Sequence, residues 1–421
     1  MYYGFKISDQ TAALARQAES DCRPIFEKID ENALICSAKV LTAFQECRVS
    51  TTDFIEVTGY GYTDDGRDKL EQVYAKVFGA EDALVRPQLM SGTHALAVTL
   101  FGLLKHGDTL LYVSGEPYDT LRSVIGTAGD SRNSLIKNGI KYEEIDLIGD
   151  EFDLDAIRKR CSESFVKVAA IQRSRGYAQR KSLTIDKIAE AIKAIKEVSP
   201  ETVIMVDNCY GEFTEDREPT DVGADVFVGS MMKNLGAGYA VSGGYCVGTR
   251  VVIEDIAERL TAPCVGKSLG ANFNQLASFY KGFFMAPTTV AATLKSMVFA
   301  ARLLELCGYD GVKPRYDEKR TDIVQTIDFH SAEKLIKFCV GIQKGSPVEA
   351  YATPEPGEMP GYPHEEIMAA GTFVTGATNE LSCDGPVCEP YTAYMQGGLS
   401  YDYGKLGVMR AVDEMMGRVV E

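Results

Sequence analysis

The sequence has few of the features that mark nucleic-acid-binding, membrane or secreted proteins. Lysine and arginine total 44 against 60 aspartates and glutamates, the formal net charge is −16, and no basic run occurs. This acidic balance disfavours binding to nucleic acid or to an anionic membrane. The first residues lack the charged-then-apolar pattern of a signal peptide, and no apolar stretch approaches the roughly 18–20 residues that span a bilayer. We therefore expect a cytoplasmic protein that acts on small molecules.

Histidine is scarce and cysteine is unpatterned, which argues against a metal site or a disulfide framework. The eleven cysteines are scattered along the chain, as is typical of reduced thiols in a reducing compartment. Only Cys383 and Cys388 lie close together, and none of the four histidines is beside them. A loop that carries two thiols is the simpler interpretation, so we expect no metal.

What the sequence does contain is an alternation of helical stretches and short apolar strands from about residue 69 to 250. Such alternation is typical of βαβ crossovers and of a mostly parallel sheet covered on both faces. We expect an N-terminal helical segment at 1–57, a large α/β domain at 58–290, and a linking helix with a smaller α+β domain at 291–421. A chain of 421 residues is long enough for two domains.

Three connecting segments can also be predicted. Helical spacing covers residues 8–48, with a break at the Cys-Arg-Pro of 22–24, and a polar loop rich in glycine and tyrosine follows at 58–68. A long helical stretch at 286–308 then leads toward the smaller domain.

The most informative pattern joins two of the strands. The apolar strand at 203–206 ends at Asp207, and the strand within 224–236 is followed by Ser230 and, three residues later, by Lys233. Open α/β sheets bind their ligands at the carboxyl ends of such strands. A pyridoxal phosphate (PLP) enzyme needs these groups: Lys233 for the covalent link to the cofactor, Asp207 under the pyridine nitrogen, and Ser230 at the phosphate. The competing lysines, Lys267 and Lys281, follow no strand with a serine three residues before them.

Residues 91–104 supply a candidate phosphate cradle. Ser91 can cap a helix, and the backbone amides of Gly92, Thr93 and His94 would then point its positive end at the phosphate. A plain helix cap is the alternative interpretation. After the next strand comes Tyr118, which could stack on the pyridine ring and donate a proton to a leaving thiol. It could equally be one loop tyrosine among the 21 in the chain.

Two glycine-containing segments resemble nucleotide-binding motifs only superficially. Residues 264–268, Cys-Val-Gly-Lys-Ser, end like a phosphate-binding P-loop, but Thr261 stands where that loop needs its first glycine. The glycine-rich segment at 236–244 does not open a clear helix, so a dinucleotide fingerprint is not indicated.

With these elements in order, the chain resembles the PLP enzymes of cysteine and methionine metabolism, and within them the methionine γ-lyase-like family known as aluminium resistance proteins. The segments that carry the likeness are VRPQLMSGTHA (85–95), AIQRSRGY (170–177), VDNCYGEF (206–213), SMMKNLG (230–236), GTFVTGATNELSCDGP (371–386) and QGGLSY (396–401). The resemblance implies the aspartate-aminotransferase fold (fold type I), with a large seven-stranded, mostly parallel sheet domain and a smaller C-terminal α+β domain. It also implies a homodimer or a homotetramer.

The resemblance further assigns positions that differ from the family pattern. In the family, a loop with a tyrosine and an arginine reaches the phosphate of the neighbouring subunit. In this chain Tyr60 stands at the position of the tyrosine and Tyr62 at that of the arginine, and Arg67 is a possible replacement for the arginine. Tyr394 stands where the family has the arginine that holds the substrate carboxylate. A guanidinium is the natural group for that role, so we expect Arg175 or Arg173 to take it over.

The expected function is a PLP-dependent carbon–sulfur lyase that acts on a sulfur-containing or related amino acid by β- or γ-elimination. The resemblance, rather than the residues, selects elimination. Two alternatives remain open: an aminotransferase or aldolase-type lyase on the same fold, and a PLP-binding stress-response protein with little turnover. The substitutions at Tyr62 and Tyr394 motivate the last of these.

Overall fold

The structure is a computed structural model that describes residues 4–60, 64–359 and 364–418. Within these residues the chain forms two compact units. The larger is Cys36–Phe284, and the smaller joins the residues up to Ile35 with those from Met285 onward. The sequence suggested a separate segment at 1–57. In the structure the helix α1 (Asp9–Glu46) runs through Ile35, so most of this helix belongs with the smaller unit.

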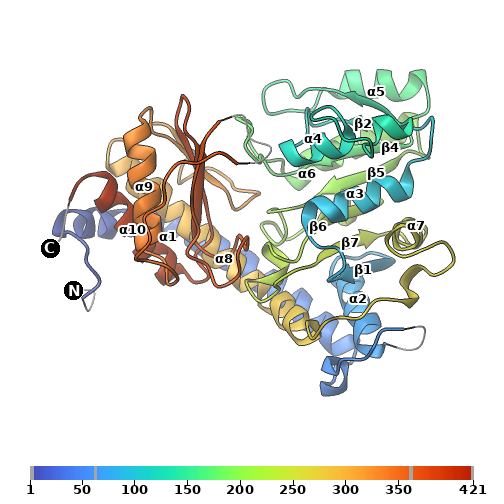
Figure 1. Cartoon of the computed structure of the whole chain (residues 1–421), viewed down its shortest axis with the longest axis horizontal. Coiled ribbons are helices and arrows are strands. Elements are labelled where there is room, and N and C mark those ends of the chain that lie inside the picture. The colour runs from blue at the N-terminus through green and yellow to red at the C-terminus, as the bar shows by residue number, and fades with distance from the viewer. Residues whose placement is uncertain (1–3, 61–63, 360–363, 419–421) are drawn as a thin grey trace. The chain divides into compact units, whose positions relative to one another are not determined.

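The larger unit is built on a seven-stranded sheet with the order β1-β7-β6-β5-β4-β2-β3 (Figure 1). The strands are β1 (Asp82–Arg86), β2 (Thr109–Tyr112), β3 (Lys141–Glu144), β4 (Val168–Gln172), β5 (Val203–Asp207), β6 (Val226–Ser230) and β7 (Gly244–Gly248). Strand β7 is antiparallel to β1 and β6, and the other neighbours are parallel. The predicted mostly parallel α/β sheet is confirmed.

Strand β3 is the member of this sheet that the sequence pattern did not indicate. Its residues are Lys-Tyr-Glu-Glu, and none of the four is buried. It lies at the edge of the sheet and pairs only with β2. Because an edge strand needs no apolar side chains on both faces, its sequence carries no hydrophobic run to reveal it.

Helices cover both faces of the large sheet. They are α2 (Asp65–Val77), α3 (Gly92–Leu103), α4 (Asp119–Ile125), α5 (Leu154–Glu163), α6 (Ile185–Val198) and α7 (Arg250–Leu260). Helices α3, α4 and α7 contribute Leu96, Leu121 and Ile253 to one buried apolar cluster on the sheet. The ring of Tyr245 in β7 lies 6.1 Å from that of Tyr74 in α2. The contact between Tyr74 and Tyr245 is on the face of the sheet opposite the apolar cluster, because successive residues of a strand point to opposite faces.

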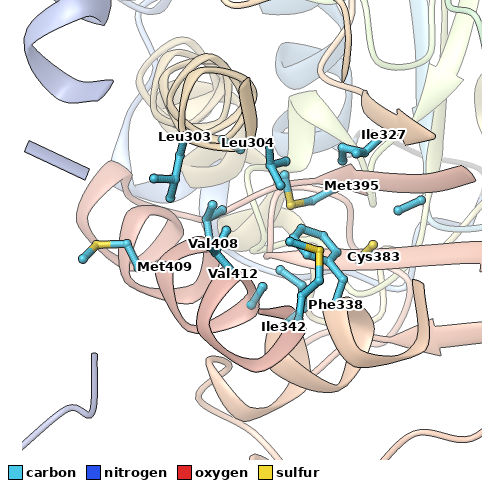
Figure 2. Close-up of a cluster of buried hydrophobic side chains, with 14 of the residues drawn as sticks. Leu303, Leu304, Ile327, Phe338, Ile342, Cys383, Met395, Val408, Met409 and Val412 are labelled. Carbon is cyan, nitrogen blue, oxygen red and sulfur yellow. The ribbon is translucent and has the colours of Figure 1, made fainter. Parts of the chain in front are cut away.

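The smaller unit contains an antiparallel sheet with the order β10-β11-β12-β9-β8. Its strands are β8 (Val312–Lys313), β9 (Gln325–Asp328), β10 (Glu366–Ala369), β11 (Ser382–Pro386) and β12 (Thr392–Gln396). The helices α9 (Ala332–Lys344) and α10 (Tyr401–Met415) pack on it with α8 (Leu276–Leu306). Figure 2 shows Phe338, Val412, Met395 and Leu304 in the shared core. This is the smaller α+β domain that the sequence predicted.

Two helices are longer than the sequence indicated. Helix α1 continues through Pro24, and α8 begins at Leu276 rather than at residue 286 and contains Pro287. Within the described residues, α8 is also long and apolar enough to cross a membrane by length and composition. The expectation that no apolar stretch reaches such a length is therefore wrong for α8. However, 72% of that apolar window is buried inside the protein, as in a core helix.

Candidate active site

The predicted Asp207, Ser230 and Lys233 are brought together at the carboxyl ends of the central strands of the large sheet. Asp207 is the last residue of β5, Ser230 is the last residue of the neighbouring β6, and Gln172 ends β4 in register with Asp207. Lys233 follows β6 directly, and its backbone N–H donates to the Ser230 carbonyl over 3.2 Å. The parallel strands thus end side by side, which is why Gln172 and Lys233 belong to one site although they are 61 positions apart in the sequence.

Lys233 is half-buried and surrounded by polar groups. Its Nζ lies 3.9 Å from the centre of the Tyr210 ring. Burial by itself lowers the pKa of the ammonium, but the surrounding groups outweigh this effect and raise the pKa well above its usual value. These groups are Cys209, Tyr210, Asp207 and Tyr118. The side chain of Lys233 is therefore protonated at neutral pH.

Asp207 is the carboxylate that balances this cation. Its side chain is buried, and its Oδ1 accepts a hydrogen bond of 3.1 Å from the backbone N–H of Cys209. Burial raises the pKa of the carboxyl, whereas Lys233 and the Cys209 amide lower it. A protonated pyridine nitrogen requires a buried carboxylate of this kind as its partner.

The start of α3 adjoins the same edge of the sheet. Ser91 caps the helix, and its Oγ accepts from the backbone N–H of His94 over 3.1 Å. A Cβ at Gly92 would lie 3.3 Å from the sulfur of Cys209 and 3.4 Å from the Cβ of Ser230. Glycine allows the helix start to approach both residues without displacing either of them. The amides at this helix start and the Ser230 hydroxyl can therefore converge on one anionic group.

Thr93 and His94 have different roles at this helix start. The Thr93 hydroxyl lies 3.0 Å from that of Tyr118, which links the cradle to the predicted ring-stacking residue. The His94 imidazole instead turns back, and its Nδ1 accepts from the Met90 backbone N–H over 3.2 Å. His94 is thus placed to contribute its backbone amide, with its ring engaged in the preceding loop.

Tyr118 is fixed at the first turn of α4. Its backbone N–H donates to Gln172 Oε1 over 2.9 Å, so the end of β4 positions it. Burial, together with the charge of Asp207 and the nearby Cys209, raises the pKa of its hydroxyl. The phenol therefore keeps its proton at neutral pH.

Arg173 is not available to a substrate, which corrects one of the two predicted carboxylate ligands. Its guanidinium is fully buried. It donates to Glu215 over 2.9 Å, to Glu218 over 3.2 Å and to Asn208 Oδ1 over 2.8 Å. These contacts satisfy two buried carboxylates and fix the loop that follows Asp207. The residue is structural because its charge is already neutralised.

Arg175 lies at a cavity. The cavity has a volume of about 880 Å³, and Tyr118, Gln172 and Arg175 are among its lining residues. Arg180 holds the neighbouring loop, with its Nη2 donating to the carbonyls of Gln172 and Ser174 over 2.7 Å each. The cavity thus borders the residue that is expected to cover the cofactor ring.

The loop expected to reach a neighbouring subunit is only partly described. Tyr62 lies outside the described residues. Tyr60 is 75% exposed and pairs with Leu269 in an isolated β-bridge. Arg67, the predicted replacement for the arginine, is buried, and its guanidinium bonds Asp68 and the carbonyl of Gly270. Tyr394 is in β12 of the smaller unit.

The competing lysines have other partners. Lys267 Nζ lies 3.0 Å from Glu71 and 2.6 Å from Asp82, so the segment that resembles a P-loop ends in an ion-pair network. Lys281 Nζ lies 4.8 Å from the ring centre of Tyr239. Among the described residues, no group of three or more histidine, cysteine or acidic side chains could hold a metal ion.

Sequence reasoning missed three residues beside Lys233: Cys209, Tyr210 and Glu212. All three follow Asp207 within five residues, and proximity to a strand-end carboxylate was the signal that could have found them. Glu212 is buried and bonds the Tyr245 hydroxyl. Burial raises the pKa of its carboxyl to about 8. These side chains complete the walls of the site.

The residues present fit PLP. The glycine at the start of α3 leaves space that a Cβ would fill, the Ser230 hydroxyl is beside it, and Asp207 and Lys233 face each other across the strand ends. The group that these residues would hold has a phosphate, a basic ring nitrogen and an aldehyde. That combination is the chemistry of the predicted cofactor.

Comparisons with known proteins point in the same direction. The profile of the methionine gamma-lyase family matches residues 11–416. The protein YnbB of Bacillus subtilis (strain 168) is 47% identical over 404 residues, which cover 96% of each chain. A crystal structure described as a carbon-sulfur lyase involved in aluminum resistance, from Clostridium novyi, has a TM-score of 0.93 and 44% identity. It covers 97% of this chain and 96% of that one.

More distant structures share the fold alone. The PLP-dependent protein YhfS of Escherichia coli has a TM-score of 0.62 at 20% identity, over 93% of this chain and 97% of that one. A methionine gamma lyase from Micromonospora echinospora has a TM-score of 0.55 at 17% identity, over 84% and 87% of the two chains. The predicted fold type I architecture is confirmed. Because the family profile spans nearly the whole sequence, the chain belongs to the methionine gamma-lyase family.

Proposed function

We propose that this protein is a PLP-dependent lyase that breaks a carbon–sulfur bond of an amino acid by β- or γ-elimination. Membership of the methionine gamma-lyase family supports the reaction class. The similar carbon-sulfur lyase of Clostridium novyi supports the bond that is cleaved. The observation that carries the proposal is the electrostatic pair of Lys233 and the buried Asp207 at the strand ends, next to Gly92 at the start of α3.

The chain's residues would hold the cofactor at three points. The amides of Gly92, Thr93 and His94, with the Ser230 hydroxyl, receive the phosphate at the positive end of α3. Asp207 would bond the ring nitrogen, a charge-assisted contact of about 1.5–3 kcal/mol. Lys233 provides the covalent link. The chemistry supplied by bound PLP is an electron sink for the pair left at Cα when its proton is removed.

Lys233 is the group that moves protons. Its amino group would be the base that takes the α-proton of the bound amino acid. Asp207 keeps the ring nitrogen protonated, so the site holds the charges that this step needs. Asp207 is buried and Lys233 is half-buried, so little water lies between the two groups to weaken their interaction.

Tyr118 covers the cofactor ring and faces the leaving group in this scheme. Its hydroxyl keeps its proton because burial raises its pKa. It can therefore donate a hydrogen bond to the sulfur that departs. A hydrogen bond of 3.0 Å joins the hydroxyls of Thr93 and Tyr118 and orients the Tyr118 hydroxyl.

Arg175 is the remaining candidate for the substrate carboxylate. It lines the cavity next to Tyr118, whereas Arg173 is engaged by Glu215 and Glu218. A planar guanidinium binds a carboxylate through two parallel hydrogen bonds. We assign the cavity of about 880 Å³ to the substrate on this basis.

A homo-oligomer forms a further part of the proposal. Large apolar side chains are exposed on four loops of the larger unit: Tyr60, Met90, Val241 and Phe273. Hydrogen bonds tie these loops together, from Gly270 N to the Gly59 carbonyl and from the Ser242 hydroxyl to the Pro87 carbonyl. An exposed apolar surface of this kind fits a second copy of the chain.

Product analysis tests the proposed reaction. Purified protein loaded with PLP is incubated with a panel of sulfur amino acids, and the products are identified. Elimination releases ammonia, a 2-oxo acid and a thiol in equal amounts. With a 2-oxo acid added as amino acceptor, transamination would instead yield a second amino acid. The variant Lys233→Ala is the control and should release none of these products. Spectral changes without any product would instead favour a PLP-binding protein with little turnover.

A further inference from the structure

Tyr210 contacts the amine of Lys233 and has no role in the function described above. Its ring centre is 3.9 Å from Nζ, well within the roughly 6 Å at which a cation is attracted to an aromatic face. The contact comes from a different segment, because Tyr210 is in the loop after β5 and Lys233 follows β6. The ring therefore lies directly against the atom that is expected to react.

The backbone at Tyr210 is held in an unusual conformation. Its φ is +71°, in the left-handed region that non-glycine residues rarely adopt. Such a conformation persists only where the surrounding structure enforces it. Next to it, Gly211 N donates to the Asn208 carbonyl over 2.9 Å, and Cys209 N donates to Asp207 Oδ1. The ring is thus aimed at Lys233 by a loop anchored on the essential carboxylate.

The buried Arg173 supports this loop from the other side. It bonds the side chain of Asn208 over 2.8 Å. A Cβ at Gly211 would lie 2.6 Å from its Cδ, so only glycine allows the two to approach. The arginine that sequence reasoning assigned to the substrate instead holds the turn that presents Tyr210.

We propose that Tyr210 is a positioning residue that holds the Lys233 ammonium on its ring face and thereby sets the pH at which this amine can react. The inference rests on the proposed function in one respect, namely that Lys233 is the lysine that PLP engages. It adds a residue outside the cofactor and substrate contacts assigned above.

Other charged and titratable groups face Lys233, and they define what the ring contributes. They come from the end of β5, the loop after it and the start of α4: Asp207, Cys209, Glu212 and Tyr118. Burial raises the pKa of the Cys209 thiol and of the Tyr118 hydroxyl, so both are neutral at neutral pH. Burial also raises the pKa of Glu212 to about 8. Of the groups named here, the Asp207 carboxylate and the Tyr210 ring face therefore stabilise the ammonium at pH 7.

Removal of the ring should make the ammonium lose its proton at lower pH. A cation–π contact of ordinary strength corresponds to a fall of about 0.4–1.5 pH units in the midpoint of this titration. A merely structural tyrosine would change stability or cofactor affinity without moving that midpoint.

The test measures the amine of the full-length protein freed of cofactor. Protein is exposed briefly to PLP at each pH of a series, and borohydride is then added to stop the reaction. Neutral Lys233 attacks the aldehyde with loss of water, and hydride from borohydride with a proton from water completes a stable secondary amine. Peptide mapping then gives the amount of product at Lys233 at each pH. The rate follows the neutral fraction of the amine, so its midpoint reports the titration without any turnover.

Tyr210→Leu should move this midpoint down by about 0.4–1.5 pH units, and Tyr210→Phe, which keeps the ring, should leave it within about 0.2 units of the parent. Tyr239→Leu is the matched control, because Tyr239 faces Lys281 in the same way, at 4.8 Å. If Tyr210→Leu does not fold, Tyr210→Asn is measured instead, since asparagine tolerates the left-handed backbone. An unchanged midpoint in the ring-free variant overturns the proposal, and so does an equal shift in Tyr210→Phe. Absence of product at Lys233 in the parent would instead refute the proposed function.

Discussion

Arg173 and Arg175 are two positions apart in the sequence, and the structure gives them different surroundings. Arg173 bonds Glu215 and Glu218, which follow more than forty residues later, and Arg175 lines a cavity. Sequence reasoning proposed both for the substrate carboxylate because both follow the end of the same strand. It could not separate them, since the carboxylates that bury Arg173 come from a loop whose path depends on the fold. Lys233 and Asp207 were predictable because strand ends meet at one edge.

The first prediction concerns Arg175. Arg175→Ala should weaken amino-acid binding by about 30- to 1000-fold, because a buried carboxylate loses a charge-assisted partner worth roughly 2–4 kcal/mol. PLP should remain bound. Titration of the loaded protein with amino acids, followed through its visible spectrum, gives the affinity.

Arg158→Ala is the control for this change, because Arg158 in α5 bonds Glu197 and is not among the residues that line the cavity. If Arg175→Ala binds amino acids as tightly as the parent, Arg175 has no part in carboxylate recognition.

The second prediction uses the buried Glu212, whose pKa is raised by burial from 4.5 to about 8. Between these values the folded protein keeps a proton that the unfolded chain has released. Stability therefore falls as pH rises through this window, by up to about 1.4 kcal/mol per pH unit from this group. Glu212→Gln removes the titration and keeps a partner for the Tyr245 hydroxyl, so it should gain stability relative to the parent from pH 5 to pH 8.

Urea unfolding at a series of pH values measures this difference. The exposed Glu201→Gln serves as the control and should follow the parent curve. Parallel pH dependence of the parent and Glu212→Gln would contradict the raised pKa.

At the scale of elements, apolar runs made most of the large sheet predictable. Strands β1, β2 and β4–β7 carry buried residues along their length, whereas β3 is polar and was missed. The long helices were misjudged for another reason. Pro24 and Pro287 suggest helix ends, yet packing along the rest of each helix outweighs the loss of one backbone hydrogen bond. Tertiary contacts of this kind leave no local signal.

The third prediction concerns the start of α3. Ser91→Ala removes the cap on His94 N and should cost about 0.5–2 kcal/mol of stability. PLP affinity should fall as well, because a frayed first turn no longer directs its amides at the phosphate. Denaturant unfolding and equilibrium binding of PLP measure the two effects.

Ser331→Ala provides the comparison, since Ser331 caps α9 in the smaller unit through Lys334 N. It should lower stability while leaving PLP affinity unchanged. An equal loss of PLP affinity in both variants would mean that the α3 cap has no special role at the site.

At the scale of the whole molecule, the sequence predicted two units of α/β and α+β character but not their division. Residues near the N-terminus belong with the smaller unit because α1 packs there through Ala12, Ala15 and Ala18. Contacts between residues some 400 positions apart, such as Ser8 Oγ to Asp413 Oδ1 at 2.7 Å, fix this arrangement. No periodicity within a short window can reveal a partner so distant in sequence.

The fourth prediction addresses assembly. The purified protein should have a mass in solution that is a multiple of its 46.0 kDa chain mass. Phe273→Glu should reduce that mass, because a charge replaces an apolar side chain that is 66% exposed in the single chain. Light scattering measures both proteins.

Ile148→Glu tests specificity, because Ile148 is equally exposed but follows β3 at the opposite edge of the sheet from β1. It should leave the mass unchanged. A parent protein that remains a single chain at micromolar concentration would contradict the proposed oligomer.

Reduction with borohydride, followed by peptide mapping, tests whether Lys233 is the lysine that PLP engages. The protein is loaded with PLP, reduced and digested, and the modified lysine is identified by mass spectrometry. We predict a single adduct on Lys233 that disappears in Lys233→Ala, because this amine alone faces Asp207 at the strand ends. An adduct on Lys267 or Lys281, or reducible PLP retained by Lys233→Ala, would contradict the account.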